Sequence, residues 1–310
     1  MNEPRALMDY LRLATAYLER CGSPSARLDA EVLLGHVLGM ERVSLYVNHD
    51  RPLETREVDA YREALRARGR GTPVAYITGK KEFLRMTLAV GPDVLIPRPE
   101  TELLVEAVAG RLRAGDKPLV LADVGTGSGA IALGLARALP GARVLAIDVS
   151  AAALSVARKN IESHGLEERV RLVQGDLLEP VAEALHGGGA LPWPWLSGDR
   201  LLDAVVSNPP YIPARDWDRL PWDVRDHEPR LALDGGPDGL AVYRRLIPQA
   251  AALLRPGGLL ALEIGHDQER AVRALLDAGG AWDHVQVDKD YAGHPRVVLA
   301  TRRSGEGHAS

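Results

Sequence analysis

A glycine-rich stretch with the sequence DVGTGSGAIA follows a short apolar run and leads into a helical pattern. Gly125, Gly127 and Gly129 allow the backbone to turn sharply and to approach a ligand without Cβ atoms in the way. The helix that follows offers unpaired N–H groups in its first turn. The spacing also fits the dinucleotide fingerprint G-x-G-x-x-A, so the turn predicts a nucleotide-type ligand and leaves its identity open.

Two carboxylates accompany this turn. Asp148 ends the next predicted strand, about 20 residues beyond the turn, where an acid can accept hydrogen bonds from ribose hydroxyls in an NAD site or an S-adenosylmethionine site. Asp123 precedes the first glycine, where a carboxylate can help to bind a cationic amino-acid group and would repel a pyrophosphate. The glycine turn and Asp148 together predict an adenosine-containing ligand and leave its identity open, and Asp123 favours S-adenosylmethionine.

A second motif, SNPPYIP at residues 207–213, ends another apolar stretch. Two consecutive prolines cannot continue a sheet or a helix, so they stiffen this strand end. The Asn208 side-chain oxygen and the Pro209 carbonyl oxygen can accept both N–H groups of a planar nitrogen and orient it toward a methyl donor. Tyr211 offers a flat surface against which an amide or a base can stack. This chemistry needs no side-chain base, because a nitrogen that gains a methyl group loses its proton readily.

The elements that must position these residues alternate between strand and helix after residue 98. Strands are predicted at residues 119–124, 143–147, 170–174, 202–207, 258–264, 284–289 and 296–301. Helices are predicted at residues 100–112, 130–139, 151–164, 239–254 and 268–278. We therefore expect an α/β domain with a mostly parallel sheet, in which Asn208 ends the fourth strand. In a doubly wound sheet that strand lies beside the first, so Asn208 is expected to face the glycine turn across the ligand crevice.

The chain ahead of this domain has a different pattern. Apolar residues recur at helical spacing up to about residue 70, with breaks at CGSPS and NHDRPL, which predicts a bundle of at least three helices. The segments VAYITG and MTLAVGPDVLIP have β-type patterns and predict a hairpin or connector. We expect a helical domain at residues 1–72, a connector at 73–97, an α/β domain at 98–303 and a disordered tail at 304–310.

Composition and charge limit the possible classes of protein. The chain is 46% hydrophobic and 26% charged, which is typical of a globular protein. It has a single cysteine, no signal-peptide pattern and no apolar run long enough to cross a bilayer, so we expect a cytoplasmic protein without a membrane partner. A net charge of -4 argues against a protein whose main task is to bind nucleic acid. We predict no metal site.

In their order along the chain, these segments resemble the N(5)-glutamine methyltransferases that modify peptide chain release factors. The resemblance covers nearly the whole chain and rests on SARLDAEVLLGHVLG, PVAYITGKKEF, VLIPRPETELLV, DVGTGSGAIAL, SNPPYIP, EPRLALDGGPDGLAVYRRLI, LRPGGLLALEIGHDQ and GHPRVVLA. The NPPY motif alone is shared with many amino-group methyltransferases, whereas the ordered set is far more specific.

The resemblance implies a fold and an activity. The fold is a seven-stranded Rossmann-like methyltransferase domain, mostly parallel with an antiparallel last strand, behind a small helical domain for substrate recognition. The activity is transfer of a methyl group from S-adenosylmethionine, which becomes S-adenosylhomocysteine, to the glutamine of the Gly-Gly-Gln motif in release factors. We expect a monomer that has release factors as its partners and forms no stable complex with nucleic acid.

The resemblance also implies roles for individual residues. The implied donor-binding residues, to which we add Asp123, are Gly125, Thr126, Gly127, Ser128, Gly129, Asp148, Asp176, Leu177 and Asn208. The implied substrate-binding residues are Asn208, Pro209, Pro210 and Tyr211, with catalytic roles for Asn208, Pro209 and Tyr211. The segment PRPETE at residues 97–102 is expected either to line the donor pocket or to begin a helix.

Two of the places where the sequence departs from the family pattern bear on possible function. Leu177 stands beside Asp176 where the family often has an aromatic residue, so it can cover an adenine ring without stacking on it. The loop at residues 186–199 looks longer than usual and carries Trp193 and Trp195. These two side chains either mark a partner contact or fold back onto the protein surface.

Other functions compete with this interpretation. An adenine N6-methyltransferase acting on DNA or RNA would use similar chemistry on an exocyclic amine, but the chain lacks a basic tract with interleaved aromatic residues. The basic residues near the domain junction form either a solvated helix face or a contact with an acidic partner; they are Arg62, Arg66, Arg68, Arg70, Lys80, Lys81 and Arg85. An NAD oxidoreductase would need a catalytic His or Tyr-Lys pair, which we do not find, and NPPY disfavours a noncatalytic scaffold.

Overall fold

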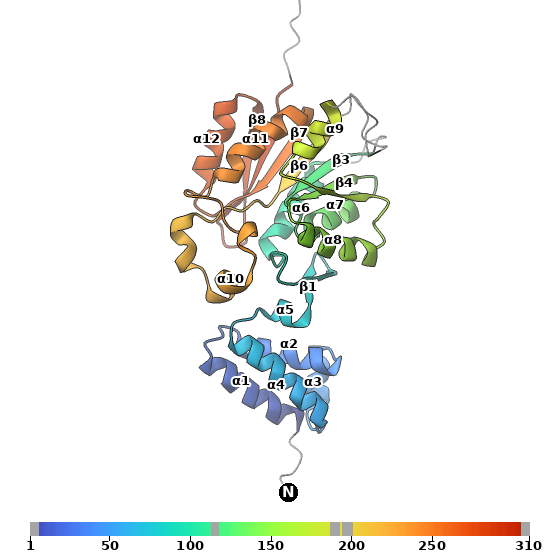
Figure 1. The fold of residues 1–310 in the computed structure, drawn as a ribbon, viewed down its shortest axis with the longest axis vertical. Coiled ribbons are helices and arrows are strands. Elements are labelled where there is room, and N and C mark those ends of the chain that lie inside the picture. The colour runs from blue at the N-terminus through green and yellow to red at the C-terminus, as the bar shows by residue number, and fades with distance from the viewer. Residues whose placement is uncertain (1–5, 113–117, 187–192, 194–200, 305–310) are drawn as a thin grey trace, which may run out of the picture. The chain divides into compact units, whose positions relative to one another are not determined.

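The computed structural model describes residues 6–112, 118–186, 193 and 201–304, and they form two compact units (Figure 1). One unit comprises Met1–Lys80 and Leu220–Glu228, and the other comprises Lys81–Arg219 and Pro229–Ser310. In the described part of the chain, no helix has the length and apolarity that a membrane span requires. The predicted tail lies almost entirely outside the described residues.

The first unit is helical. Its elements are α1 (Leu7–Arg20), α2 (Ala26–Leu38), α3 (Arg42–Val47), α4 (Thr55–Gly69), α5 (Val74–Thr78) and α10 (Trp222–His227). Leu7, Leu33 and Leu45 are fully buried in its core, where the Tyr61 hydroxyl donates to the Ala30 carbonyl at 2.9 Å. The late segment α10 belongs to this unit because the Trp222 ring lies against the backbone of Gly71, where an added Cβ would come within 1.8 Å of it. The predicted bundle is therefore present and also includes a helix from much later in the sequence.

Two sequence expectations fail in this unit. The β-type interpretation of VAYITG is wrong, because these residues form α5, with Pro73 at its N-cap and Gly79 in the left-handed region at φ 70° after its last residue. These helix start and stop signals outweigh the β-branched side chains between them. Arg68 is not part of a solvated face: it is buried, and its Nε donates to Asp29 at 2.7 Å.

The second unit is built on a seven-stranded sheet. Its strands are β3 (Val120–Val124), β4 (Arg143–Asp148), β5 (Val170–Gln174), β6 (Leu202–Ser207), β7 (Leu254–Glu263), β8 (Trp282–Lys289) and β9 (Pro295–Arg302). The spatial order is β5-β4-β3-β6-β7-β9-β8. The pairs from β5 to β7 are parallel, and β9 runs antiparallel to both of its neighbours. The predicted mostly parallel sheet with an antiparallel last strand is confirmed.

Helices cover both faces of this sheet (Figure 1). One face packs against α6 (Pro99–Arg111), α7 (Ala130–Ala138) and α8 (Ala151–Ser163), and the other packs against α9 (Glu179–His186), α11 (Ala241–Leu253) and α12 (Glu269–Gly279). Alternate strand residues contribute to the two cores, as with Val205 on the α11 side and Val206 on the α6 side. Because both faces are covered, the strands appear in the sequence as continuous apolar runs. Such runs made the strands easy to predict.

Smaller elements complete the second unit and its connections. β1 (Lys80–Phe83) and β2 (Met86–Ala89) form a hairpin whose first strand is KKEF and not the predicted VAYITG, and two short 3₁₀ helices lie at Ala214–Arg219 and Arg230–Ala232. Neither α9 nor α10 was predicted from the sequence. Trp193 is 8% exposed and belongs to the core on the α11 side, so it folds back onto the protein. The remainder of the predicted 186–199 loop, including Trp195, lies outside the described residues apart from the α9 end.

Candidate active site

Three strand ends meet at the carboxyl edge of the sheet. β3 lies between β4 and β6, with Val124 opposite Ile147 on one side and opposite Ser207 on the other. The residues that follow these positions are Gly125, Asp148 and Asn208. The predicted juxtaposition of the fourth strand with the glycine turn is therefore confirmed by the strand pairing.

A cavity of about 330 Å³ opens at this edge. Many of the residues that line it were predicted from the sequence as site residues, namely Gly125, Gly127, Asp148, Asp176, Leu177, Asn208 and Pro210. Apolar side chains of Val124, Ile147 and Ala153 form part of its wall. The cavity combines an apolar wall with a few polar groups, which is typical of a small-molecule site.

The glycine turn forms one wall of the cavity through its backbone. Gly125 and Gly127 are in the left-handed region at φ 74° and 54°, and a Cβ atom on either would meet nothing within 4 Å. Gly129, at φ 83°, is the N-cap of α7. The N–H groups of Gly125 and Thr126 both donate to the Ile147 carbonyl at 2.9 Å, which ties the turn to β4. The space that side chains would occupy at Gly125 and Gly127 is thus left for a ligand.

Asp148 lies at the end of β4 and lines the cavity. One carboxylate oxygen accepts the Gly127 N–H at 2.9 Å, and the other accepts the Ser150 N–H at 2.9 Å. Each oxygen keeps a lone pair, so the carboxylate can still accept two hydroxyl donors. Burial raises the pKa of Asp148, and its backbone hydrogen bonds oppose that shift.

Four of the predicted donor residues support the turn and do not line the cavity. Asp123 is fully buried, and its Oδ2 accepts the Thr126 hydroxyl at 2.6 Å and the Ala132 N–H at 3.0 Å. Its other oxygen is buried and has no hydrogen-bond partner among the described residues, and burial raises the pKa of Asp123 to about 7. The Ser128 carbonyl accepts Asn160 Nδ2 at 2.8 Å. Direct contact of Asp123, Thr126, Ser128 and Gly129 with a ligand stays a prediction.

Asp176 and Leu177 also line the cavity, together with Arg245, which was not predicted from the sequence. Arg245, on α11, donates from Nη2 to Asp176 at 2.7 Å and to Glu179 at 3.2 Å. Leu177 lies in the left-handed region at φ 51°, which is unusual for a residue other than glycine. A helix residue nearly seventy positions away gives no sequence signal for such a contact.

Asn208 contacts Thr101 from another element, and Thr101 in turn contacts Glu263. Asn208 Nδ2 donates to the Thr101 hydroxyl at 3.1 Å, and that hydroxyl donates to Glu263 Oε2 at 2.7 Å. Thr101 is on α6 and Glu263 is the last residue of β7, and both are buried. Burial raises the pKa of Glu263 to about 7, whereas the Thr101 hydrogen bond and Arg296 act to lower it. The side-chain oxygen of Asn208 is left as the acceptor of this amide.

Pro209 and Tyr211, both predicted to act in catalysis, do not line the cavity. Pro209 is buried, and Tyr211 is partly buried with its carbonyl accepting Gln268 Nε2 at 3.0 Å. Burial, and to a smaller extent the nearby charge of Glu263, raises the pKa of Tyr211 to about 12. Its hydroxyl therefore keeps its proton near neutrality. Their contact with a substrate stays a prediction.

The segment PRPETE takes the second of its two expected forms. Its Arg98 is the N-cap of α6, with Pro99 in the first turn, and none of residues 97–102 lines the cavity. Residues 93–95 line it instead, and Asp234 lines it from the segment after α10. Residues 93–95 lie before PRPETE, separated from it by Ile96, and the sequence did not predict them as part of the wall.

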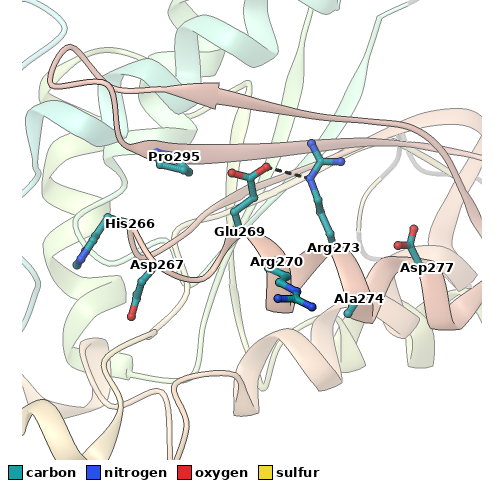
Figure 2. Close-up of a pocket in the computed structure, with 8 residues that line it drawn as sticks. All are labelled: His266, Asp267, Glu269, Arg270, Arg273, Ala274, Asp277 and Pro295. Atoms are coloured by element: carbon teal, nitrogen blue, oxygen red, sulfur yellow. Dashed lines mark hydrogen bonds and ion pairs between the residues drawn. The ribbon is translucent and has the colours of Figure 1, made fainter.

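A second and larger hollow, of about 630 Å³, lies along α12 (Figure 2). It is lined by charged side chains that include Arg270 and Asp277, and by Glu269, which pairs with Arg273 at 3.1 Å. None of the predicted site residues lines it. Within the described ranges, no group of His, Cys, Asp and Glu side chains is arranged to hold a metal ion.

The fold and this cavity define the class of protein as a Rossmann-like methyltransferase. Residues 121–185 match the family model described as a methyltransferase domain, and residues 9–79 match the one described as the PrmC N-terminal domain. The methyltransferase match lies in the α/β part of the chain, and the PrmC N-terminal match lies in the helical part.

Relatives identify the family more narrowly. The chain is 50% identical over 292 residues to the release factor glutamine methyltransferase of Moorella thermoacetica, covering 94% of this chain and 95% of that protein. It is 45% identical to the enzyme of the same name from Chlorobaculum tepidum, covering 92% of this chain and 94% of that protein. A solved structure titled protein-(glutamine-N5) methyltransferase (release factor-specific), from Alicyclobacillus acidocaldarius, is 32% identical with a TM-score of 0.41 over 70% of this chain and 100% of that chain. The chain belongs to the release factor glutamine methyltransferase family.

Proposed function

We propose that this chain transfers a methyl group from S-adenosylmethionine to the side-chain amide nitrogen, N5, of the glutamine in the Gly-Gly-Gln motif of a release factor. The observation that carries the proposal is that Asn208 lines the same cavity as Asp148 and the glycine turn. A donor held by the turn and a nitrogen held by Asn208 would therefore share one enclosed space. Family membership supports the choice of a glutamine amide as the acceptor.

The charges around the cavity favour a cationic donor. Among the described residues, four carboxylates line it, from Asp93, Asp148, Asp176 and Asp234, against one guanidinium, from Arg245. That guanidinium already pairs with Asp176 and Glu179. A pyrophosphate would be repelled by this set, whereas a sulfonium and an ammonium group would be attracted. The cavity thus fits S-adenosylmethionine better than NAD.

Individual residues have separate parts in holding this donor. Asp148 would accept the ribose hydroxyls, and the bare backbone at Gly125 and Gly127 would allow the donor's amino-acid part to come close. Leu177 would cover the adenine ring by apolar contact alone. When bound, the donor supplies an electrophilic methyl group on a positively charged sulfur.

The chain's own contribution to the reaction is orientation of a weak nucleophile. The lone pair of an amide nitrogen is delocalised, so the nitrogen attacks only when its face is directed at the methyl group. Asn208 Oδ1 and the Pro209 carbonyl would accept its two N–H groups, and Tyr211 would lie against the amide plane. No residue needs to remove a proton beforehand, because the acidity of the nitrogen rises as the new bond forms.

The same site chemistry admits an exocyclic adenine amine as an alternative acceptor. We favour the release factor because of family membership and because the net charge of -4 is unsuited to tight nucleic-acid binding. We also propose that the enzyme acts as a monomer, does not form stable nucleic-acid complexes and works in the cytoplasm, where release factors meet ribosomes.

Incubation with a methyl-labelled donor tests this assignment. A purified release factor and a duplex DNA would be offered separately, at equal concentration, with the Asn208→Ala variant as the matched control. We expect label in the release factor that depends on Asn208 and none in the DNA. Label in DNA and none in the release factor would contradict the proposal.

A further inference from the structure

We infer that Thr101 and Glu263 are positioning residues that fix which end of the Asn208 amide faces the substrate. The inference rests on the function proposed above and extends it to two residues that lie outside the cavity lining. The hydrogen bonds run in one line, from Asn208 Nδ2 to the Thr101 hydroxyl at 3.1 Å and from that hydroxyl to Glu263 Oε2 at 2.7 Å. We call these three side chains the amide relay.

The relay matters because an asparagine amide has two chemically opposite ends. An oxygen toward the substrate accepts the N–H groups of a glutamine amide, whereas an NH₂ group there would oppose another NH₂ group. The asparagine backbone alone does not distinguish these two orientations, which differ by a half-turn of the side-chain amide. Some partner on the other side of Asn208 must therefore select one.

Thr101 makes this selection only if its own proton is committed elsewhere. A hydroxyl has one proton to donate and can also accept. Ionised Glu263 can only accept, so it takes the Thr101 proton and leaves the Thr101 oxygen as an acceptor for Asn208 Nδ2. Glu263 is 1% exposed and Thr101 is 4% exposed, so water does not offer an alternative partner. The Asn208 oxygen is then the end left for the substrate.

Protonation of Glu263 would remove this selection. A protonated carboxyl can donate to the Thr101 oxygen, and the Thr101 hydroxyl is then free to donate to Asn208, which favours the reversed amide. The charged and titratable groups around Glu263 are Arg296 from β9, Arg98 and Glu100 from the start of α6, and Tyr211 and Tyr243. Tyr243 donates its hydroxyl to the Glu263 backbone carbonyl at 2.8 Å, so it does not compete for the carboxylate.

Thr101→Val is the first test, because valine keeps the shape of threonine and lacks the hydroxyl. We expect the single-turnover rate of release-factor methylation to fall about tenfold to a hundredfold, with donor affinity unchanged and with recovery in Thr101→Ser. Ser207→Ala is the matched control: it removes another buried hydroxyl, which donates to the Val124 carbonyl at 2.7 Å beside Asn208 but outside the relay, and we expect a smaller loss. Wild-type turnover in Thr101→Val would overturn the inference.

Two further measurements separate positioning from general damage. If Thr101 acts through Asn208, adding Thr101→Val to Asn208→Ala should slow the reaction little further, whereas independent effects would multiply. The methylation rate of the wild type should rise with pH as Glu263 ionises. The rate of Glu263→Gln should not show this rise. Multiplying effects, or the same rise in Glu263→Gln, would overturn the inference. Failure of the wild type to methylate any release factor would instead refute the proposed function.

Discussion

The two sides of the cavity are held in place in different ways. On the side of the glycine turn, most contacts use a backbone N–H group from the turn or from the adjacent strand end, such as Gly125 N–H with the Ile147 carbonyl and Ser150 N–H with the Asp148 carboxylate. On the side of Asn208, the contacts join side chains that are 107 and 162 positions apart. Local motifs therefore shape the donor side, and tertiary packing of α6 and β7 shapes the acceptor side.

This difference predicts that mutations on the two sides have different kinetic consequences. Changes at the turn or at Asp148 should act on donor affinity, because these groups offer hydrogen bonds and space to the donor. Changes at Asn208 should act on the rate of transfer from bound donor, because orientation of the acceptor matters only in the reacting complex.

Asn208→Ala should have the largest effect. The single-turnover rate at saturating donor should fall about a thousandfold, because the acceptor nitrogen loses a group that orients it. Titration with S-adenosylhomocysteine should give an affinity close to that of the wild type. An unchanged rate, or a large loss of affinity with little loss of rate, would break the proposed division between the two sides.

Asp148→Ala should show the reverse pattern. The dissociation constant for the donor should rise by about tenfold to a hundredfold, because two hydrogen bonds to a charged acceptor are lost. The rate at saturating donor should stay within a few-fold of the wild type. Equal affinity in the variant, measured by calorimetry, would remove Asp148 from the donor site.

Gly125→Ala and Gly165→Ala form a matched pair. Both glycines are in the left-handed region, at φ 74° and 63°, and an added Cβ meets nothing within 4 Å at either position. Each substitution should cost about 1 kcal/mol of folding stability through backbone strain. Only Gly125 lines the cavity, so only Gly125→Ala should weaken donor binding, by several-fold. Equal donor affinity in the two variants would mean that the space at Gly125 is not used.

The pH dependence of stability should reveal the buried Asp123, with a smaller effect than those above. Its pKa is about 7 in the folded protein against an ordinary value of 3.8, so the folded state holds this proton over a range in which the unfolded chain has lost it. Stability therefore falls as pH rises through that interval. Asp123→Asn should lose less stability than the wild type between about pH 5 and pH 8 in urea titrations. The pKa of Glu263 is also raised in the folded protein, so the stability of Asp123→Asn should still fall somewhat with pH. Identical slopes in the two proteins would contradict a buried, protonated Asp123.

Much of the donor side could be predicted from the sequence because its signals are local. The turn, the strand that ends at Asp148 and the strand that ends at Asn208 each lie within one short segment, and a doubly wound sheet brings their ends together. The buried strands also differ clearly from the helices in length and composition. The β-type interpretation failed at residues 74–78, where β-branched residues lie between a proline and a glycine and form a helix.

The rest depends on contacts that no local pattern encodes. Thr101 was predicted only as part of a possible pocket wall or helix start, and Glu263 only as part of a strand, yet Asn208 donates to Thr101 and Thr101 donates to Glu263. Arg245 reaches Asp176 from a helix late in the chain. Asp123 could be located beside the turn, but its burial beneath the turn follows from the packing of α7.

Locating the transferred methyl group by mass spectrometry tests the central claim most directly. The release factor would be methylated by the wild-type chain and by Asn208→Ala, digested, and its Gly-Gly-Gln peptide fragmented. We predict one added methyl group on the glutamine side-chain amide with the wild type and none with the variant. A methyl group on any other residue, or the same glutamine modification by Asn208→Ala, would contradict the account.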